Sequence, residues 1–497
     1  TAFNQPLSFD TSSVTDMSGM FAGAVVFDQP LRFVTSGVVS MRAMFDGASA
    51  FNQLLSVGNV SNVSAALSSA AQRRALLSED APASDQPLHF ATSNVKDMSA
   101  MFRGAVAFNQ PLPPHFATSS VTDMRSMFHR ALVFNQPLDF GAAKVATGRR
   151  ALSSAVRSPR ALSAGALAPD EQPSFDTANV NDMADMFSGA TAFNQPLSFD
   201  TSSVTDMSGM FAGAVVFDQP LHFVTSGVND MADMFNGATA FDKPLGFDTS
   251  SINNMSGMFN GATAFDKPLR FDTSNVNDMA DMFNGATAFN KSLEFDTSSV
   301  NDMSGMFRDA SAFDQPLGFN TSNVNDMSGM FQDAAAFDKP LGFDTSSIND
   351  MSDMFNGATA FDEPLSFDTS NVDDMGGMFQ GATAFDQPLD FDTSSVTDMS
   401  SMFQDAAAFD KPLGFDTSSV TNMGGIFEGA NLSDANKLLV RCAWEGNEAF
   451  SSPPANYSLG GPGSNADWNL GACPPSSPPS SPPPPSPPSP PSSPPSP

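Results

Sequence analysis

Aspartate follows the phenylalanine of PLxF in most copies of a 24-residue motif, with Val224 and Asn320 as exceptions in the regular array, and such a row of carboxylates could hold metal ions. One copy reads FNQPLSFDTSSVTDMSGMFAGAVV and begins at Phe193. Ca²⁺ prefers carboxylate oxygens, but dedicated calcium repeats have denser Asp-Gly loops than this motif. We keep Ca²⁺ as the one cofactor hypothesis and predict no other. The candidate row consists of Asp248, Asp272, Asp296, Asp344, Asp368, Asp392 and Asp416.

A second row of aspartates precedes methionine in the TDM and NDM segments. An Asp at the start of a turn accepts hydrogen bonds from backbone N–H groups two or three residues later. We therefore predict that this row caps the following turn and binds no metal. Its members are Asp182, Asp206, Asp230, Asp278, Asp302, Asp326, Asp350, Asp374 and Asp398.

Enzymatic chemistry finds no support in the residue pattern. The four histidines are scattered, and neither cysteine has a histidine near it in the sequence. A glycine-rich phosphate loop and a cluster of zinc ligands are both missing from the sequence. The sequence thus predicts a protein that is not an enzyme, with no catalytic and no cofactor-binding residues.

One position, between Leu and Phe of PLxFDT, varies more than any other along the array. If Leu and Phe point inward, the residue between them points outward, because side chains alternate along an extended segment. Variation there is typical of a binding face, and equally of an unconstrained surface. We call these positions the variable column: Ser198, His222, Gly246, Arg270, Glu294, Gly318, Gly342, Ser366, Asp390 and Gly414.

Threonine and serine also form a row, in FDTSS. A regular Thr ladder could bind ice or a mineral surface, and we keep this as a minor alternative. The other interpretation is that Thr201 and its equivalents bond to backbone groups at a corner of the coil.

These rows must be positioned by a repeated coil. Leu197 and Phe199 have strand spacing, whereas Val204, Met207, Met210 and Phe211 have the spacing of a helical or 3-10 turn. The fold class predicted is a leucine-rich-repeat-like solenoid with one short parallel strand and one such turn per 24-residue coil, in about 16 coils. The Met and Phe columns are expected to form its core.

The motif is interrupted twice and then ends, which suggests a domain plan. Both interruptions are rich in Ala, Ser and Arg, and we expect looped-out insertions. We predict repeat coils at 1–55 and 85–140, a degenerate or inserted segment at 56–84, an inserted low-complexity segment at 141–170, a regular array at 171–430, a C-terminal cap at 431–473 and a Ser-Pro-rich stalk at 474–497.

The predicted cap differs from the array in composition. It holds the chain's two cysteines, for which we favour a Cys442–Cys473 disulfide, and a short amphipathic helix with Asp434 near its start. Asn431 and Asn456 are the preferred glycosylation sites among the Asn-x-Ser/Thr matches. The Ser-Pro segment predicts a disordered polyproline II stalk.

Composition limits the partners. The 497 residues include 54 acidic and 22 basic ones, a net charge of −32. Nucleic acid is disfavoured because phosphates require clustered cations, whereas cations, basic proteins and glycans are compatible. The sequence has no apolar stretch of the roughly 20 residues that a membrane helix needs.

The segment PLSFDTSSVTDMSGMFAGA resembles the BspA-like leucine-rich repeat, in the Met-Phe-rich variant of mycoplasma surface lipoproteins and algal secreted proteins. The resemblance implies a right-handed solenoid with a parallel sheet on one face, and surface display with adhesion or protein binding. The Ser-Pro tract resembles hydroxyproline-rich glycoproteins of algal walls. We therefore expect an extracellular or wall-associated scaffold that binds proteins or glycans through its sheet face, with a purely structural matrix spacer as the alternative.

Overall fold

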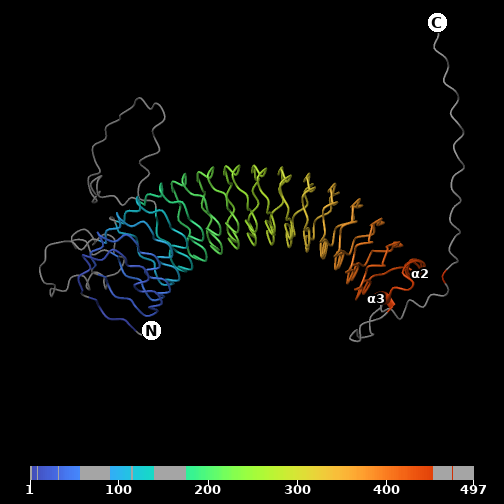
Figure 1. Ribbon diagram of the computed structural model, residues 1–497, viewed down its shortest axis with the longest axis horizontal. Coiled ribbons are helices and arrows are strands. Elements are labelled where there is room, and N and C mark those ends of the chain that lie inside the picture. Colours follow the sequence, from blue (N-terminus) through green and yellow to red (C-terminus); the bar gives the residue numbers. More distant parts are fainter. Residues whose placement is uncertain are drawn as a thin grey trace, which may run out of the picture.

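The computed structural model describes residues 3–7, 9–31, 33–55, 90–113, 116–138, 175–451 and 473. These residues form a single stack of coils that bends into an arch, with the N-terminal coils at one end and helices α2 and α3 at the other (Figure 1). The chain is therefore a repeat solenoid, in which each coil contacts its two neighbours.

Parallel β-bridges hold the coils together along one side of the stack. Each coil contributes a single residue, usually the Asp before Met, and fourteen bridges join fifteen coils within the described residues. In the regular array, consecutive bridges such as Asp206 to Asp230 are 24 residues apart. The period read from the sequence is thus the period of the stack.

Around each bridge, backbone N–H groups that donate to the next coil alternate with N–H groups that donate within their own coil. The amides of Met207 and Gly209 donate to the carbonyls of Asp230 and Ala232 in the next coil, at 3.1 and 2.8 Å. The amide of Met210 instead donates to the carbonyl of Met207 in its own coil, at 3.2 Å, which closes a turn. We call residues 205–213 and their equivalents in other coils the bridged strip.

This arrangement corrects the predicted elements. Leu197 and Phe199 lie in no strand, and residues 204–211 form hydrogen-bonded turns and no helix. Gly209 has φ of 60° and Gly213 has φ of 67°. Left-handed residues at these two positions interrupt both a helix and a strand. The alternation of side chains is confirmed, since Leu197 and Phe199 are buried and Ser198 is exposed.

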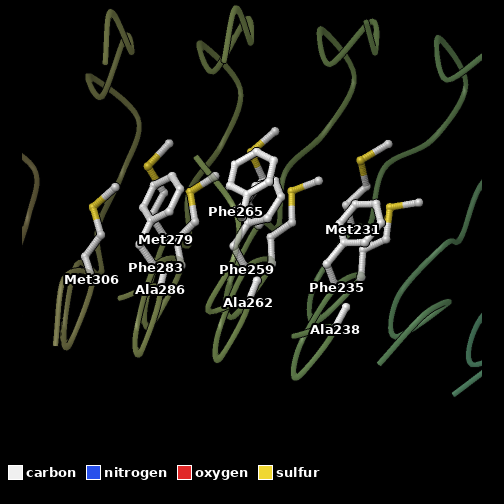
Figure 2. Close-up of a cluster of buried hydrophobic side chains, with 14 of the residues drawn as sticks. Met231, Phe235, Ala238, Phe259, Ala262, Phe265, Met279, Phe283, Ala286 and Met306 are labelled. Carbon is white, nitrogen blue, oxygen red and sulfur yellow. The ribbon is translucent and has the colours of Figure 1, made fainter. Parts of the chain in front are cut away.

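The interior consists of stacked identical residues, as the Met and Phe columns predict. Figure 2 shows Met231, Phe235 and Ala238 of one coil beside the equivalent side chains of the neighbouring coils. All three side chains have no exposed surface, and Phe235 and Phe259 stack with ring centroids 5.6 Å apart. Each coil thereby covers the apolar face of the next, which extends one core along the whole stack.

The spacing of the Phe ladders explains the bend. Ring centroids in successive coils are 5.6 Å apart for Phe235 and Phe259, within the bridged strip, but 6.4 Å apart for Phe223 and Phe247 in the PLxF segment. Successive coils are thus closer together at the bridged strip than at the PLxF segment, and the stack fans apart toward the PLxF segment. The bridged strip therefore lies on the inner side of the arch, and the PLxF segment lies on the outer side.

The stack is continuous across both interruptions of the motif. The bridges pass directly from Ser40 to Asp97 and from Asp123 to Asp182. The rings of Phe45 and Phe102 are 5.6 Å apart, as in the regular array. Residues 56–89 and 139–174 themselves lie outside the described residues. After each of them, the next coil continues the stack.

A small cap closes the C-terminal end. Helix α2 (Asp434–Ala443) begins at its N-cap Ser433, and helix α3 (Glu448–Ser451) follows it. The ring of Trp444 stacks on Phe415 at 6.3 Å and on Phe427 at 5.8 Å, which covers the end of two Phe ladders.

The predicted disulfide is present in the cap, because Cys442 and Cys473 are bonded with their Cα atoms 5.6 Å apart. The predicted polyproline stalk at 474–497 and Asn456 lie outside the described residues.

Candidate binding surface

The variable column is exposed along the whole regular array. Each member stands between a buried Leu and a buried Phe, so its side chain points to solvent whatever its type. The exposed members are Ser198, His222, Gly246, Arg270, Glu294, Gly318, Gly342, Ser366, Asp390 and Gly414. The structure thus aligns these ten residues in one row, but it does not place them on a sheet. They lie on the outer side of the arch, opposite the bridged strip.

The FDT aspartates lie next to the variable column and are occupied by local hydrogen bonds. Oδ1 of Asp248 accepts from the backbone N–H of Ser250 at 3.2 Å and from its hydroxyl at 2.7 Å. The hydroxyl and the N–H of the serine two residues on lower the pKa of the aspartate, and this holds for Asp248, Asp296, Asp344, Asp368, Asp392 and Asp416. Their turns explain the row without a metal ion.

Across the part of the chain that the structure describes, no three His, Cys, Asp or Glu residues are grouped so that they could hold a metal ion. Calcium binding by the FDT row stays a hypothesis, and it has no preformed cage in its favour. The sequence pattern found the row, but only the structure shows that each carboxylate turns back to its own serine.

The second row of aspartates caps turns, as predicted. Oδ1 of Asp206 accepts from the N–H of Ser208 at 3.0 Å and from its hydroxyl at 2.7 Å. These carboxylates lie on the inner side of the arch and are half-buried. Desolvation, followed by the charges of neighbouring aspartates, raises the pKa of Asp230, Asp278 and Asp374, although each also accepts a backbone N–H.

A third ladder, at FN or FD before the proline, was missed by the sequence analysis. Oδ1 of Asn194 accepts from the N–H of Asp218 in the next coil at 3.0 Å and from the side chain of Gln219 at 2.9 Å. Where the next coil carries lysine, the acceptor is Asp, as in the 2.5 Å ion pair of Lys267 with Asp242. The signal was in the sequence, because the five lysines of the regular array each follow an Asp one coil earlier: Lys243, Lys267, Lys291, Lys339 and Lys411.

The threonine row cannot face ice or a mineral. Thr201 is 1% exposed, and its hydroxyl donates to the carbonyl of Val224 in the next coil at 2.8 Å. Equivalent bonds recur along the array, so the Thr ladder hypothesis was wrong and the structural interpretation of this row is confirmed.

The remaining predicted site lies at the start of the cap. Asn431 is exposed, and its side-chain amide donates to the carbonyl of Ala407 at 3.1 Å. No described helix is both long and apolar enough to cross a lipid bilayer.

Comparison with known proteins gives a family and no function. No curated protein and no solved structure matches the chain. A family described as "Mycoplasma protein of unknown function, DUF285" matches residues 1–83, 67–164, 163–270, 269–343 and 342–438. These tandem matches cover most of the sequence, including both interruptions of the 24-residue motif. The chain therefore belongs to the DUF285 repeat family.

Proposed function

We propose that this protein is an extracellular scaffold, at a cell surface or wall, that binds proteins or glycans through its variable column. The observation that carries the proposal is a row of ten exposed residues that differ in type, set on coils whose inward residues are nearly identical. Arg270 and Glu294 stand in adjacent coils of this row and have opposite charge. A fixed frame with a variable outer row is what a recognition surface requires.

The place of the two interruptions adds support. Leu55 and Phe90 are buried at the positions that Leu197 and Phe199 hold in a regular coil, so residues 56–89 replace one member of the variable column. Residues 139–174 begin and end at the same place in their coil, after Leu138 and before Phe175. Large additions at this column leave the stack intact, which favours the outer side as the side on which sequence is displayed.

The decisive experiment is binding of the full chain to a glycan array and to a panel of purified extracellular proteins. We expect a specific ligand whose binding is lost in the Arg270→Gly, Glu294→Gly double variant. Glycine occupies this column at Gly246, so the variant keeps the fold. The matched control is Asn253→Thr, an exposed residue on the bridged strip where Thr205 stands in another coil, and it should bind normally.

The rival function is a structural spacer of the extracellular matrix. A spacer needs only the length and stiffness of the stack, so it would retain no ligand, and the column variant would behave like the native protein. Equal binding of the column variant and the native chain to a ligand would place recognition elsewhere on the molecule.

We also propose a kinship with BspA-like leucine-rich repeats. The parallel ladder, the inward Leu and the solenoid architecture support it. The bridged strip follows the FDTSS segment and does not contain the leucine, so this coil would be a variant in which turns replace the strand.

A further inference from the structure

We propose that Asn320 is an N-glycosylation site, which places one glycan in the middle of the outer side of the solenoid. The inference rests on the extracellular setting of the proposed function, but not on ligand binding. Four Asn-x-Ser sequons lie in the described residues: Asn254, Asn290, Asn320 and Asn431. Attachment occurs on the side-chain amide nitrogen, and the folded protein must then accommodate a bulky polar group at its surface.

Two of the four sequons are built into ladders between coils. Oδ1 of Asn290 accepts from the N–H of Asp314 at 3.1 Å and from the side chain of Gln315 at 2.7 Å, so this half-buried amide lies between two coils. Asn254 forms β-bridges with Asp230 and Asp278 on the bridged strip and is also half-buried. A glycan on Asn290 would have to separate stacked coils, and a glycan on Asn254 would have to leave a half-buried side chain on the bridged strip.

Asn320 differs from both because its side chain is exposed. Its Oδ1 accepts from the N–H of Ser322 at 3.2 Å and from the hydroxyl of Ser322 at 2.9 Å. The backbone carbonyl of Asn320 accepts the hydroxyl of Thr297 in the preceding coil at 2.8 Å. None of these bonds uses the amide nitrogen, so a glycan there leaves the turn and the contact between coils unchanged.

The surroundings of Asn320 also have room. Gly318 in the same coil and Gly342 in the next coil carry no side chain, and a Cβ built on either would meet no atom within 4 Å. The equivalent residues in the neighbouring coils are Asp296 and Asp344, which are exposed and bonded to their own serines. A glycan would thus extend over two empty positions of the variable column.

The occupant of this position in other coils supplies a clean variant. Asp fills it in most of the array and makes the same bonds to serine, so Asn320→Asp removes the sequon and keeps the turn. Ser322→Ala removes the sequon by a second route and leaves Asn320 in place. Asn290→Asp is the matched control, because it removes a sequon that the ladder makes unsuitable.

The test is secretion of the full chain from a eukaryotic cell behind a heterologous signal peptide, followed by peptide mass spectrometry before and after amidase deglycosylation. We expect Asn320 to be occupied in most molecules, Asn290 and Asn254 to be bare, and both Asn320→Asp and Ser322→Ala to lose this glycan. The Asn320→Asp protein should melt within a few degrees of its deglycosylated parent. A bare Asn320, or folded protein glycosylated at Asn290 instead, would overturn the proposal.

Ligand binding is measured separately, on native and Asn320→Asp protein. A glycan at Asn320 with no ligand in the binding panel would leave this inference standing and contradict the proposed function. A bare Asn320 with a specific ligand at the variable column would contradict this inference and leave the proposed function standing.

Discussion

At the scale of single residues, two rows of aspartate repeat with the same period, and each row has members whose pKa is shifted in the opposite direction from those of the other row. The FDT row is exposed, and hydrogen bonds from serine lower the pKa of its members, such as Asp248. The second row is half-buried on the bridged strip, and desolvation with neighbouring carboxylates raises the pKa of Asp278 and Asp374. Charge on Asp248 therefore favours the folded state, whereas charge on Asp278 and Asp374 opposes it.

We expect the Asp278→Asn, Asp374→Asn double variant to be more stable than the native chain at neutral pH. A raised folded-state pKa means that the ionised carboxylate costs stability above that pKa, and that this cost disappears as pH falls to the unfolded value of about 3.9. Solvent screening limits the gain to about 0.5 kcal/mol per site. Asn occupies the same position at Asn254 and Asn422, so the fold tolerates it.

Thermal unfolding between pH 7 and pH 3 measures this effect. The difference in melting temperature between variant and native protein should be largest at pH 7 and should close toward pH 3. An Asp248→Asn control should lower the melting temperature at pH 7, because it removes a carboxylate whose pKa is lowered in the folded protein. A stability difference for Asp278→Asn, Asp374→Asn that does not change with pH would contradict the electrostatic argument.

At the scale of the element, the bridged strip is a run of turns, and from residue 185 to residue 305 one of its left-handed positions alternates between Asp and Gly in successive coils. Asp233 has φ of 56° and Gly257, one coil later, has φ of 60°. The carboxylate of Asp233 occupies the space that a Cβ on Gly257 would need. The same Asp-then-Gly order recurs at Asp185 and Gly209, so in these pairs of adjacent coils the Asp and the Gly are complementary.

We expect Gly257→Ala to destabilise the protein by about 1–2 kcal/mol, because alanine pays for a left-handed backbone and meets the Asp233 carboxylate. Gly246→Ala is the control, since Gly246 has open space around it and should be neutral. Chemical denaturation measures both. Adding Asp233→Gly to Gly257→Ala should recover part of the loss, and a full loss in that double variant would refute the proposed contact.

At the scale of the whole molecule, the stack tolerates insertion on its outer side and is closed by a cap at its C-terminal end. The bridges skip residues 56–89 and 139–174, and the amides of Met41 and Met124 donate to the carbonyls of Asp97 and Asp182 at 3.0 Å, as in the regular array. Trp444 ends the Phe ladders, and the Cys442–Cys473 disulfide lies within the cap. Each coil of the array is thus held by contacts with its nearest neighbours.

We expect that replacing residues 56–89 by one serine, which joins Leu55 to Phe90 as in a regular PLSF segment, will leave the melting temperature within a few degrees. The coils on either side already stack directly, so the shortened chain keeps every contact described between them. Calorimetry and circular dichroism check this. Inserting Gly-Ser-Gly after Ser256, inside the bridged strip, should in contrast lower the melting temperature strongly, and equal tolerance at both places would contradict the two-sided architecture.

Much of this architecture follows from the sequence. A period of 24 residues, identical Met and Phe columns, and the alternation of Leu197, Ser198 and Phe199 determined a solenoid, its core and its exposed column, because a copied unit can bury its apolar face only against another copy. Asp capping of the following turn and the two-cysteine cap were predicted for similarly local reasons.

The tertiary structure alone decided which segment pairs between coils. The spacing of Leu197 and Phe199 favoured a strand there, but the hydrogen bonds between coils form at residues 205–213, where left-handed residues interrupt the turns and alternate amides donate to the next coil. That choice places the variable column outside the arch and away from the bridges. Coil-to-coil geometry also decided that Thr201 is buried and that Asn320 is exposed, because both outcomes depend on neighbours 23 to 24 residues away.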